Sequence, residues 1–445
     1  MYLYCSPLGL GALITFSIDK METAEMTMQK DFKSILIDNF VENTEFYTNF
    51  EKKRKIAFED FSAQNFPTTR HEEWKYTNIS KLLANNFHLP VANSKMTLDK
   101  VAHFFLPNTE KTNRIVFING FFAERLSDIK DADLLIKEDS LACFSDDIET
   151  KKNIFCALNI ALNTTRTTII INKNVRKPIV AYFIVDATNE NIFAQPSIIV
   201  RTEAENAQMI AKYDTIGENI AFTNSLEEVI LMENAHLIQY KIQNDKPNAH
   251  HIHKAYVTHE FGVNNSYTNH TYCLNGGILR NHLDAKINAK GASLNLYGLS
   301  LLKGKTHADN RTVADHIQPN CESNEIYKGI YDDKSVGVFN GKIFVRRPAQ
   351  KTNAYQQSRN ILLSDDAAIY AKPQLEIWAD DVKCSHGATT GQLDETALFY
   401  LRSRGIPEKA AKALLTKAFA GEITEKIEVS FLKTYLEEVI EERMN

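Results

Sequence analysis

A chain of 445 residues with 44% hydrophobic and 24% charged side chains is long enough for two or three structural units and too apolar for extensive disorder. Its formal net charge of -5 argues against nucleic acid as the main partner, because phosphate binding requires a basic surface. The six cysteines lack the clustered spacing of a disulfide framework, so we expect reduced thiols and a cytoplasmic protein.

Residues 1–30 are predicted to be a non-native start or a disordered extension. The apolar run 8–18 is similar to a signal peptide, but no Lys or Arg precedes it and it is too short to span a bilayer. Met21 is favoured over Met1 as the start of the mature protein. No other segment approaches transmembrane length, so we expect no membrane contact.

Residues 31–112 are predicted to form an N-terminal helical domain. Apolar side chains recur at intervals of three and four between residues 31 and 61, which indicates one or two amphipathic helices. The segment 66–77 contains a proline turn and delivers Glu72, Glu73 and Trp74 to a short helical element. We favour a linker that anchors Trp74 in a small core over any catalytic use of the two glutamates.

Residues 113–393 are predicted to form a parallel β-helix. Short, β-branched segments separated by polar turns begin near Arg114, and few long helical stretches lie between them, which excludes a doubly wound α/β sheet. A phrase beginning at Glu205 is echoed at Glu233, and similar phrases begin near Val263 and Lys290. Steps of this size, between about 20 and 50 residues, indicate a solenoid. We therefore expect a mainly β protein whose right-handed parallel β-helix core is flanked by helical domains.

Residues 394–445 are predicted to return to helix as a C-terminal domain. Asp394 is a candidate N-cap, Gly405 ends the first helix and Pro407 opens the second. A third helix, about 429–443, has an acidic face that we interpret as solvated. The apolar positions of the first two helices include Leu401, Leu414, Leu415 and Phe419.

Cys384 and His386 are the strongest candidates for chemistry. Two positions apart on an extended chain, they project to the same side, and a thiolate with an imidazole suits iron or zinc. A closed structural zinc site needs four ligands, however. Spacing alone therefore leaves two interpretations open: an ordinary pair of side chains on one turn of the β-helix, or half of a site completed elsewhere in the fold or by a partner chain.

Three weaker patterns have structural explanations that we favour. His307, His316 and Cys321 have ligand types that suit a transition metal, but Asp- and His-rich turns also serve backbone hydrogen bonding. The tract 250–253 contains three histidines, which we interpret as scattered residues on an exposed strand. Residues 298–306 imitate a phosphate-binding loop, but the spacing of the glycines is wrong and no helix is predicted to follow.

Six segments form long motifs: 67–77, Asp315 to Gly329, 337–345, 350–354, 358–364 and Cys384-Ser-His-Gly-Ala-Thr-Thr390. Together they resemble the SufB/SufD family of SUF iron–sulfur cluster assembly scaffolds. The resemblance runs from about residue 31 to the C-terminus and favours the D-type over the B-type subunit, because Cys384-Ser-His386 replaces the B-type Glu-His-Glu motif and 377–380 lacks the B-type cysteine.

The resemblance implies a scaffold without enzymatic activity. It implies that the β-helix pairs with a SufB-like subunit as a heterodimer, that the C-terminal helices bind a SufC-like ATPase, and that His386 assists nascent cluster assembly at the subunit interface, with a less secure role for Cys384. No tightly bound cofactor is expected in isolation, only an iron–sulfur cluster held transiently at the interface. A homodimer of the isolated chain stays open, as do two alternatives: a B-type scaffold that binds the cluster directly, and a carbohydrate-active β-helix enzyme.

Overall fold

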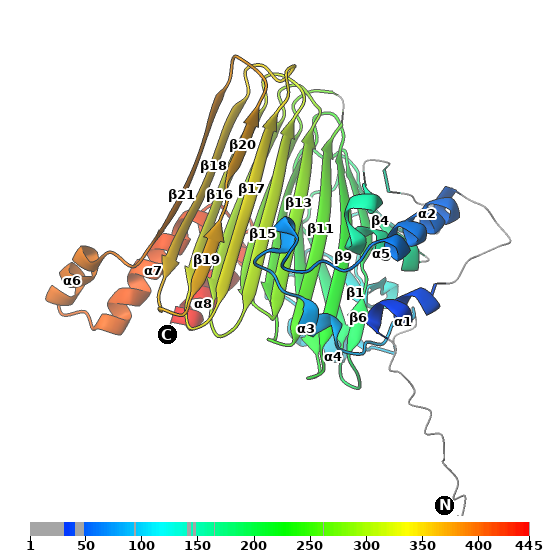
Figure 1. The fold of residues 1–445 in the computed structure, drawn as a ribbon, viewed down its shortest axis with the longest axis horizontal. Coiled ribbons are helices and arrows are strands. Elements are labelled where there is room, and N and C mark those ends of the chain that lie inside the picture. The colour runs from blue at the N-terminus through cyan, green and yellow to red at the C-terminus, as the bar shows by residue number, and fades with distance from the viewer. Residues whose placement is uncertain are drawn as a thin grey trace, which may run out of the picture.

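The computed structural model describes residues 31–40, 49–92, 95–139, 144–145, 148–163, 165–260 and 262–444. The predicted extension 1–30 lies outside these ranges, and so do Phe46 and Tyr47 of the predicted N-terminal helices and two of the six cysteines, Cys5 and Cys143. The fold is mainly β, as predicted, with a parallel β-solenoid between helices at its two ends (Figure 1). Its right-handed sense stays a prediction.

In the described part of the chain the strands form two sheets of ten and eleven strands, which we call sheet I and sheet II. From β7 to β19 successive strands alternate between the two sheets, and neighbours within each sheet are mostly parallel. The chain therefore coils around a space that we call the lumen. Sheet I runs in the order β2 (Phe121–Phe122), β1 (Asn113–Ile118), β5 (Ile179–Asp186), β8 (Ala207–Ile216), β10 (His236–Asn244), β12 (Ser266–Asn275), β14 (Ser293–Leu302), β16 (Glu322–Tyr331), β18 (Asn353–Leu362) and β21 (Lys383–Gly391).

Sheet II faces sheet I across the lumen. Its order is β19 (Ala368–Ala371), β17 (Val336–Val345), β15 (His307–His316), β13 (Ile278–Ile287), β11 (Ala249–His259), β9 (Ala221–Leu231), β7 (Ser197–Thr202), β4 (Arg166–Ile171) and β3 (Leu134–Asp139), with β20 (Gln374–Ile377) beside β17 and β6 (Ile192–Ala194) beside β9. The described strands thus begin at Asn113 and end at Gly391. The predicted domain boundaries themselves stay predictions.

The register corrects one step of the sequence repeat. The echoed phrases at Glu205 and Glu233 would align Ala207 with Ala235, but Ala207 pairs with Leu237, two positions further along the chain. In sheet II the spacing of the two phrases does hold, since Ala221 pairs with Ala249. The difference is taken up in the turns, where Asn234 adopts a left-handed conformation that asparagine tolerates better than most residues.

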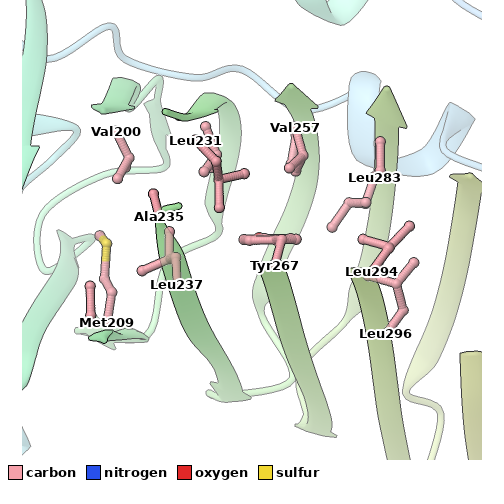
Figure 2. Close-up of a cluster of buried hydrophobic side chains, with 14 of the residues drawn as sticks. Val200, Met209, Leu231, Ala235, Leu237, Val257, Tyr267, Leu283, Leu294 and Leu296 are labelled. Carbon is pink, nitrogen blue, oxygen red and sulfur yellow. The ribbon is translucent and has the colours of Figure 1, made fainter. Parts of the chain in front are cut away.

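The lumen is apolar along much of its length (Figure 2). Side chains alternate between the two faces of a strand, so every second residue points inward and meets the opposite sheet. Sheet II contributes Val200, Leu231, Val257 and Leu283, and sheet I contributes Met209, Leu237, Tyr267, Leu294 and Leu296. Toward β18 the luminal positions become polar, with Thr312, Glu325, Gln356 and Ser358 fully or almost fully buried.

Of the N-terminal helices, α1, α2 and α5 lie against the solenoid near its first strands, whereas η1 lies further along, over β15 (Figure 1). Phe32 and Leu36 are buried in one cluster with Phe155, Phe193 and Phe222 of later elements, so these short helices depend on tertiary packing for stability. The helices are α1 (Phe32–Asp38), α2 (Asn49–Ala63), the 3₁₀ helix η1 (Glu72–Trp74), α3 (Ser80–Leu83), α4 (Leu98–Val101), the 3₁₀ helices η2 (Ala102–Phe104), η3 (Glu124–Leu126) and η4 (Thr150–Lys152), and α5 (Ile154–Leu162).

The C-terminal helices α6 (Glu395–Ser403), α7 (Glu408–Thr424) and α8 (Ser430–Met444) follow the last strand. The predicted N-cap is confirmed, because the Asp394 side chain accepts hydrogen bonds from the backbone N–H groups of Thr396 and Ala397. Gly405, with φ of +87°, ends α6 as predicted, and Pro407 immediately precedes α7. Buried residues of α7 and α8, including Ile423, Leu432 and Leu436, pack on the outer face of sheet I.

Two further observations bear on the early expectations. In the described ranges no helix is long and apolar enough to cross a membrane. Four cysteines, Cys156, Cys273, Cys321 and Cys384, are free thiols.

Candidate functional site at the open end of the solenoid

The strand that carries Cys384 and His386 lies at the open edge of sheet I. β21 pairs with β18, with Cys384 opposite Ala354 and His386 opposite Gln356. Paired residues of parallel strands point to the same face, and Ala354 and Gln356 are both buried in the lumen. Cys384 and His386 therefore point toward the mouth of the lumen. No strand in the described ranges pairs with the other edge of β21.

The two candidate ligands differ in environment. Cys384 is half-buried and packs against the luminal core, and burial raises the pKa of its thiol. The thiolate is the form that attacks electrophiles and binds metals, so this environment disfavours Cys384 as a ligand. His386 is exposed, like every residue from Ser385 to Gly391. Of the pair, His386 is the group that a metal or a partner chain can reach.

Behind His386 a row of polar side chains runs into the lumen. Glu325 of β16, Gln356 of β18 and His386 of β21 are successive register partners. Gln356 Nε2 donates to Glu325 Oε2 at 3.0 Å, and Thr312 Oγ1 donates to the same oxygen at 2.8 Å. Burial raises the pKa of Glu325 to about 7, although these two hydrogen bonds oppose the shift.

Sequence reasoning missed Glu325 and Gln356 as parts of a site. Glu325 lies within the quoted motif Asp315 to Gly329, but nothing in that motif alone indicates its partner. The available signal was the repeat, because one turn of the solenoid back from His386 reaches Gln356 and a second turn reaches Glu325.

The weaker candidate metal cluster, for which we favoured a structural explanation, is not brought together by the fold. His307 and His316 lie at opposite ends of β15, where His307 Nε2 is 3.0 Å from Thr77 Oγ1 and His316 Nε2 is 2.8 Å from Ser323 Oγ. Cys321 is buried and its Sγ donates to Ala289 O at 3.2 Å. A strand of this length separates its ends by about 30 Å, too far for one ion. Among the described residues there is no group of three His, Cys, Asp or Glu side chains that could hold a metal ion.

The histidine tract also needs correction. His251 and His253 share one face of β11, as expected for a strand, but that face is the lumen, and both side chains are only 3% exposed. His253 Nε2 lies 3.3 Å from Glu227 Oε2. The expectation of an exposed strand was wrong because this face meets sheet I across the lumen, where the ring of Tyr213 on β8 lies 5.2 Å from the His251 ring.

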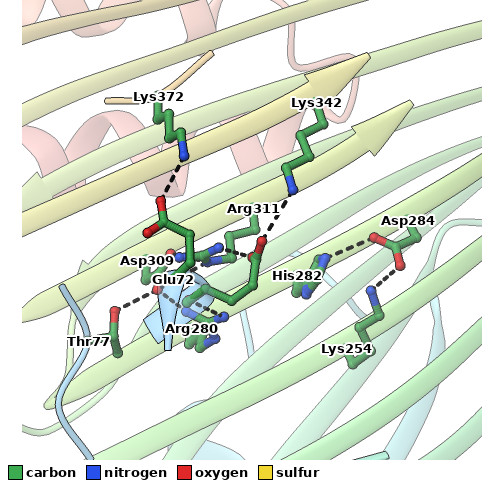
Figure 3. Close-up of polar contacts among 11 residues, drawn as sticks. Glu72, Thr77, Lys254, Arg280, His282, Asp284, Asp309, Arg311, Lys342 and Lys372 are labelled. Atoms are coloured by element: carbon green, nitrogen blue, oxygen red, sulfur yellow. Dashed lines mark hydrogen bonds and ion pairs between the residues drawn. The ribbon is translucent and has the colours of Figure 1, made fainter. Parts of the chain in front are cut away.

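The motif 67–77 lies across the outer face of sheet II, and we call it the strap (Figure 3). Glu73 forms ion pairs with Arg311 and, at 3.2 Å, with Lys342. Burial raises the pKa of Glu73, but Arg311 and Lys342 outweigh it and lower that pKa below its ordinary value. At the end of the strap, Thr77 Oγ1 donates to Asp309 Oδ2 at 2.6 Å. The two glutamates thus tie the strap to the sheet, since Glu72 also pairs with Lys372 at 2.8 Å.

Comparisons with known proteins support these motifs. Residues 183–419 match the model of the SufBD core domain, described as SUF system FeS cluster assembly, and residues 36–173 match the SufBD protein N-terminal region. This chain belongs to the SufBD family. It is 33% identical over 413 residues to a SufBD family protein of Synechocystis, covering 87% of this chain and 90% of that protein. It is 30% identical over 373 residues to SufD of Escherichia coli, covering 82% and 86%.

Membership of the SufBD family bears on the alternatives. The matched SufBD core reaches past β21 into α7, so it includes Cys384, His386 and the whole of α6. The match to the SufBD N-terminal region includes the strap. These matches give no support to a carbohydrate-active enzyme.

In this SufBD protein the apolar residues predicted on the C-terminal helices divide between two environments. Leu414 is 49% exposed, and Leu401 and Leu415 are half-buried. Phe419 instead faces sheet I, where Lys328 Nζ lies 4.2 Å from the centre of its ring. Sequence reasoning missed Phe399 and Tyr400 of α6, which are 74% and 55% exposed.

Proposed function

We propose that this chain is a non-catalytic, D-type scaffold subunit of a cytoplasmic SUF complex, in which it pairs with a SufB-like subunit and binds a SufC-like ATPase. The main support is that β21 has one edge unpaired among the described strands and bears the exposed imidazole of His386. The iron–sulfur cluster is the complex's product, held transiently and not a resident cofactor of this chain.

Pairing with a second β-helix is supported by the terminal turn of the solenoid. An open strand edge presents unpaired N–H and C=O groups, which are a template for another strand. Beside β21, the last turn of sheet II leaves Tyr370, Ile377 and Trp378 exposed by 41%, 41% and 43%. A partner that covers both the edge and these side chains would bury them, and its own side chains would supply the further ligands that a site at His386 needs.

Binding of an ATPase is supported by α6. None of the residues of this helix is buried, and it projects away from the solenoid (Figure 1). Phe399 and Tyr400 on α6 and Leu414 on α7 together expose a large apolar surface. Exposed aromatic residues of this kind are typical of the centre of a protein interface. Movement of the ATPase would pull on α6 and, through residues 392–394, on β21 and the interface.

The test is cluster assembly by the complete complex, formed by co-expression with the SufB-like and SufC-like subunits. His386→Ala should leave co-purification unchanged and reduce the rate of cluster formation by about tenfold or more, the usual effect of disturbing a metal site. Thr389→Ala is the matched control, because Thr389 lies exposed on the same strand but pairs with Arg359, on the face away from the lumen. If His386→Ala formed clusters at an unchanged rate, His386 would have no role in assembly. If the unaltered chain did not co-purify with the SufB-like and SufC-like subunits, the proposed partners would be wrong.

A further inference from the structure

We propose that Gln356, backed by the carboxyl group of Glu325, is a positioning residue that fixes the orientation and tautomer of His386. This inference deepens the proposed function, on which the metal-facing role of His386 rests. Its starting point is the row Glu325, Gln356 and His386 across three adjacent strands.

The amide group of Gln356 has a defined orientation. Its Nε2 donates to Glu325 Oε2, so the NH₂ end faces the carboxyl group and the carbonyl oxygen Oε1 faces elsewhere. Gln356 is fully buried, and within the described residues its Oε1 has no hydrogen-bond partner. A buried amide oxygen without a donor is unfavourable, so this acceptor requires a partner.

Space for this orientation is provided by the opposite sheet. Gly341 of β17 faces Gln356 across the lumen, and a Cβ atom at Gly341 would overlap Gln356 Nε2. A side chain at position 341 would therefore displace the amide group of Gln356. The glycine lets Gln356 extend across the lumen to the opposite sheet.

The neighbour on the open side of Gln356 is His386. Side chains at paired positions of adjacent strands lie about 5 Å apart at Cβ, within reach of a hydrogen bond between an amide and an imidazole. The imidazole ring has one N–H to donate when neutral, and Gln356 Oε1 needs a donor. Donation from His386 to Gln356 would satisfy the buried oxygen and leave the second ring nitrogen, with its lone pair, facing the mouth of the lumen.

This arrangement is the one that metal-binding histidines use. A histidine ligand usually donates its other N–H to a carboxylate or carbonyl oxygen, which selects the tautomer and holds the ring in place. Here the acceptor is the Gln356 carbonyl oxygen, and Glu325 and Thr312 hold the amide from behind. The row of Glu325, Gln356 and His386 therefore holds one ring nitrogen of His386 unprotonated and oriented toward the interface, where it can bind a metal or sulfur-bound iron.

The test is nitrogen NMR of the isolated full-length chain with ¹⁵N-labelled histidine, at a pH where imidazole is neutral. The signals of His386 are assigned by their loss in His386→Gln. In the unaltered chain we expect two well-separated ring-nitrogen shifts, as for a single tautomer. Gln356→Met, which keeps the length of the side chain but removes the acceptor, should bring the two shifts closer together, as tautomers exchange.

Two further variants complete the design. Ser358→Ala is the matched control, because Ser358 is equally buried on β18, one luminal position away, and pairs with Ala388. It should leave the shifts of His386 unchanged. Glu325→Gln keeps an acceptor for the Gln356 amide but removes the charge, and it should reduce the separation partly. If Gln356→Met does not fold, the shift separation in Glu325→Gln tests the inference in its place.

An unchanged separation in Gln356→Met, or in Glu325→Gln where only that variant folds, would overturn the inference. Cluster assembly in the complete complex is the second readout, where Gln356→Met should slow cluster formation severalfold while His386→Ala slows it more. If His386→Ala had no effect on cluster formation, the proposed function would fail. The NMR experiment would still test independently whether Gln356 positions His386.

Discussion

The guanidinium carbon of Arg280 lies 3.7 Å from the centre of the Trp74 ring, so a cation of the solenoid covers an aromatic ring of the strap. Arg280 also donates from Nη2 to the backbone oxygen of Glu73 at 3.0 Å and pairs with Asp309, while Trp74 contacts Phe155 of α5 with ring centroids 5.5 Å apart. One arginine thus holds the strap to sheet II by a cation–π contact, hydrogen bonding and charge.

Trp74→Ala should detach the strap. The change removes a half-buried ring and its contact with a desolvated cation, which together are worth about 2 kcal/mol of the free energy of unfolding. Trypsin should then cut faster after Arg70 and Lys75, which lie on the strap. Proteolysis and urea denaturation measure both effects. The matched control is Trp378→Ala at the second of the two tryptophans, which should leave cleavage at Arg70 and Lys75 unchanged.

Acid should destabilise the protein through buried histidines such as His259. Burial lowers the pKa of His259 to about 4, although a hydrogen bond to Asn265 at 2.9 Å opposes the shift. The unfolded chain, with a histidine pKa of about 6.5, binds more protons between pH 6.5 and 4, so the free energy of unfolding falls as the pH falls through that window. For His259 the loss is on the order of 3 kcal/mol.

His259→Asn keeps a donor near the position of Nδ1 but does not titrate. Its free energy of unfolding should therefore fall less steeply between pH 6.5 and 4, whatever its value at neutral pH. Urea denaturation at a series of pH values measures the slope. The same slope in His259→Asn as in the unaltered chain would contradict the prediction.

Gly341→Ala should destabilise the open end of the solenoid. The new methyl group would overlap Gln356 and force its amide to move, and such overpacking costs about 1–3 kcal/mol. Gly387→Ala on β21 is the matched control, because nothing lies within 4 Å of its added Cβ. That variant should change the free energy of unfolding by less than about 0.5 kcal/mol. Equal effects of the two substitutions in thermal or urea denaturation would show that the lumen has room at Gly341.

Phe399→Asp should separate binding from folding. Its side chain is 74% exposed, so we expect the melting temperature of the isolated chain to be almost unchanged while co-purification with the ATPase is lost. Phe419→Ala should instead lower the melting temperature and leave co-purification intact, because the Phe419 ring packs on sheet I with Lys328 Nζ 4.2 Å from its centre. A stable, correctly folded Phe399→Asp variant that still co-purifies would exclude α6 as the docking helix.

Much of the fold could be predicted from local patterns. The short, β-branched segments separated by polar turns that begin near Arg114 mark the start of the strands, and β1 begins at Asn113. The capping of α6 by Asp394 was equally predictable, because an N-cap depends on residues adjacent in sequence. The spacing of the echoed phrases predicted the wrong register between β8 and β10. A turn can contain extra residues without any change in the sequence phrase that follows it.

Sites were harder to predict. The alternation of side chains along a strand shows which residues share a face, but not whether that face is buried or exposed. His251 and His253 share a face with apolar luminal residues, and the pattern could not distinguish that face from a solvated one. In the same way Leu414 and Phe419 belong to one predicted apolar stripe, yet only Phe419 meets sheet I.

The sequence by itself determined that this chain is a β-solenoid of the SufBD family and that Cys384 and His386 share a face of one strand. Only the tertiary structure decided that this strand is an open edge, that the thiol of Cys384 is partly covered, and that Gln356 and Glu325 stand behind His386. The physical reason is that burial and hydrogen bonding depend on side chains brought together from successive turns of the solenoid, which no local pattern contains.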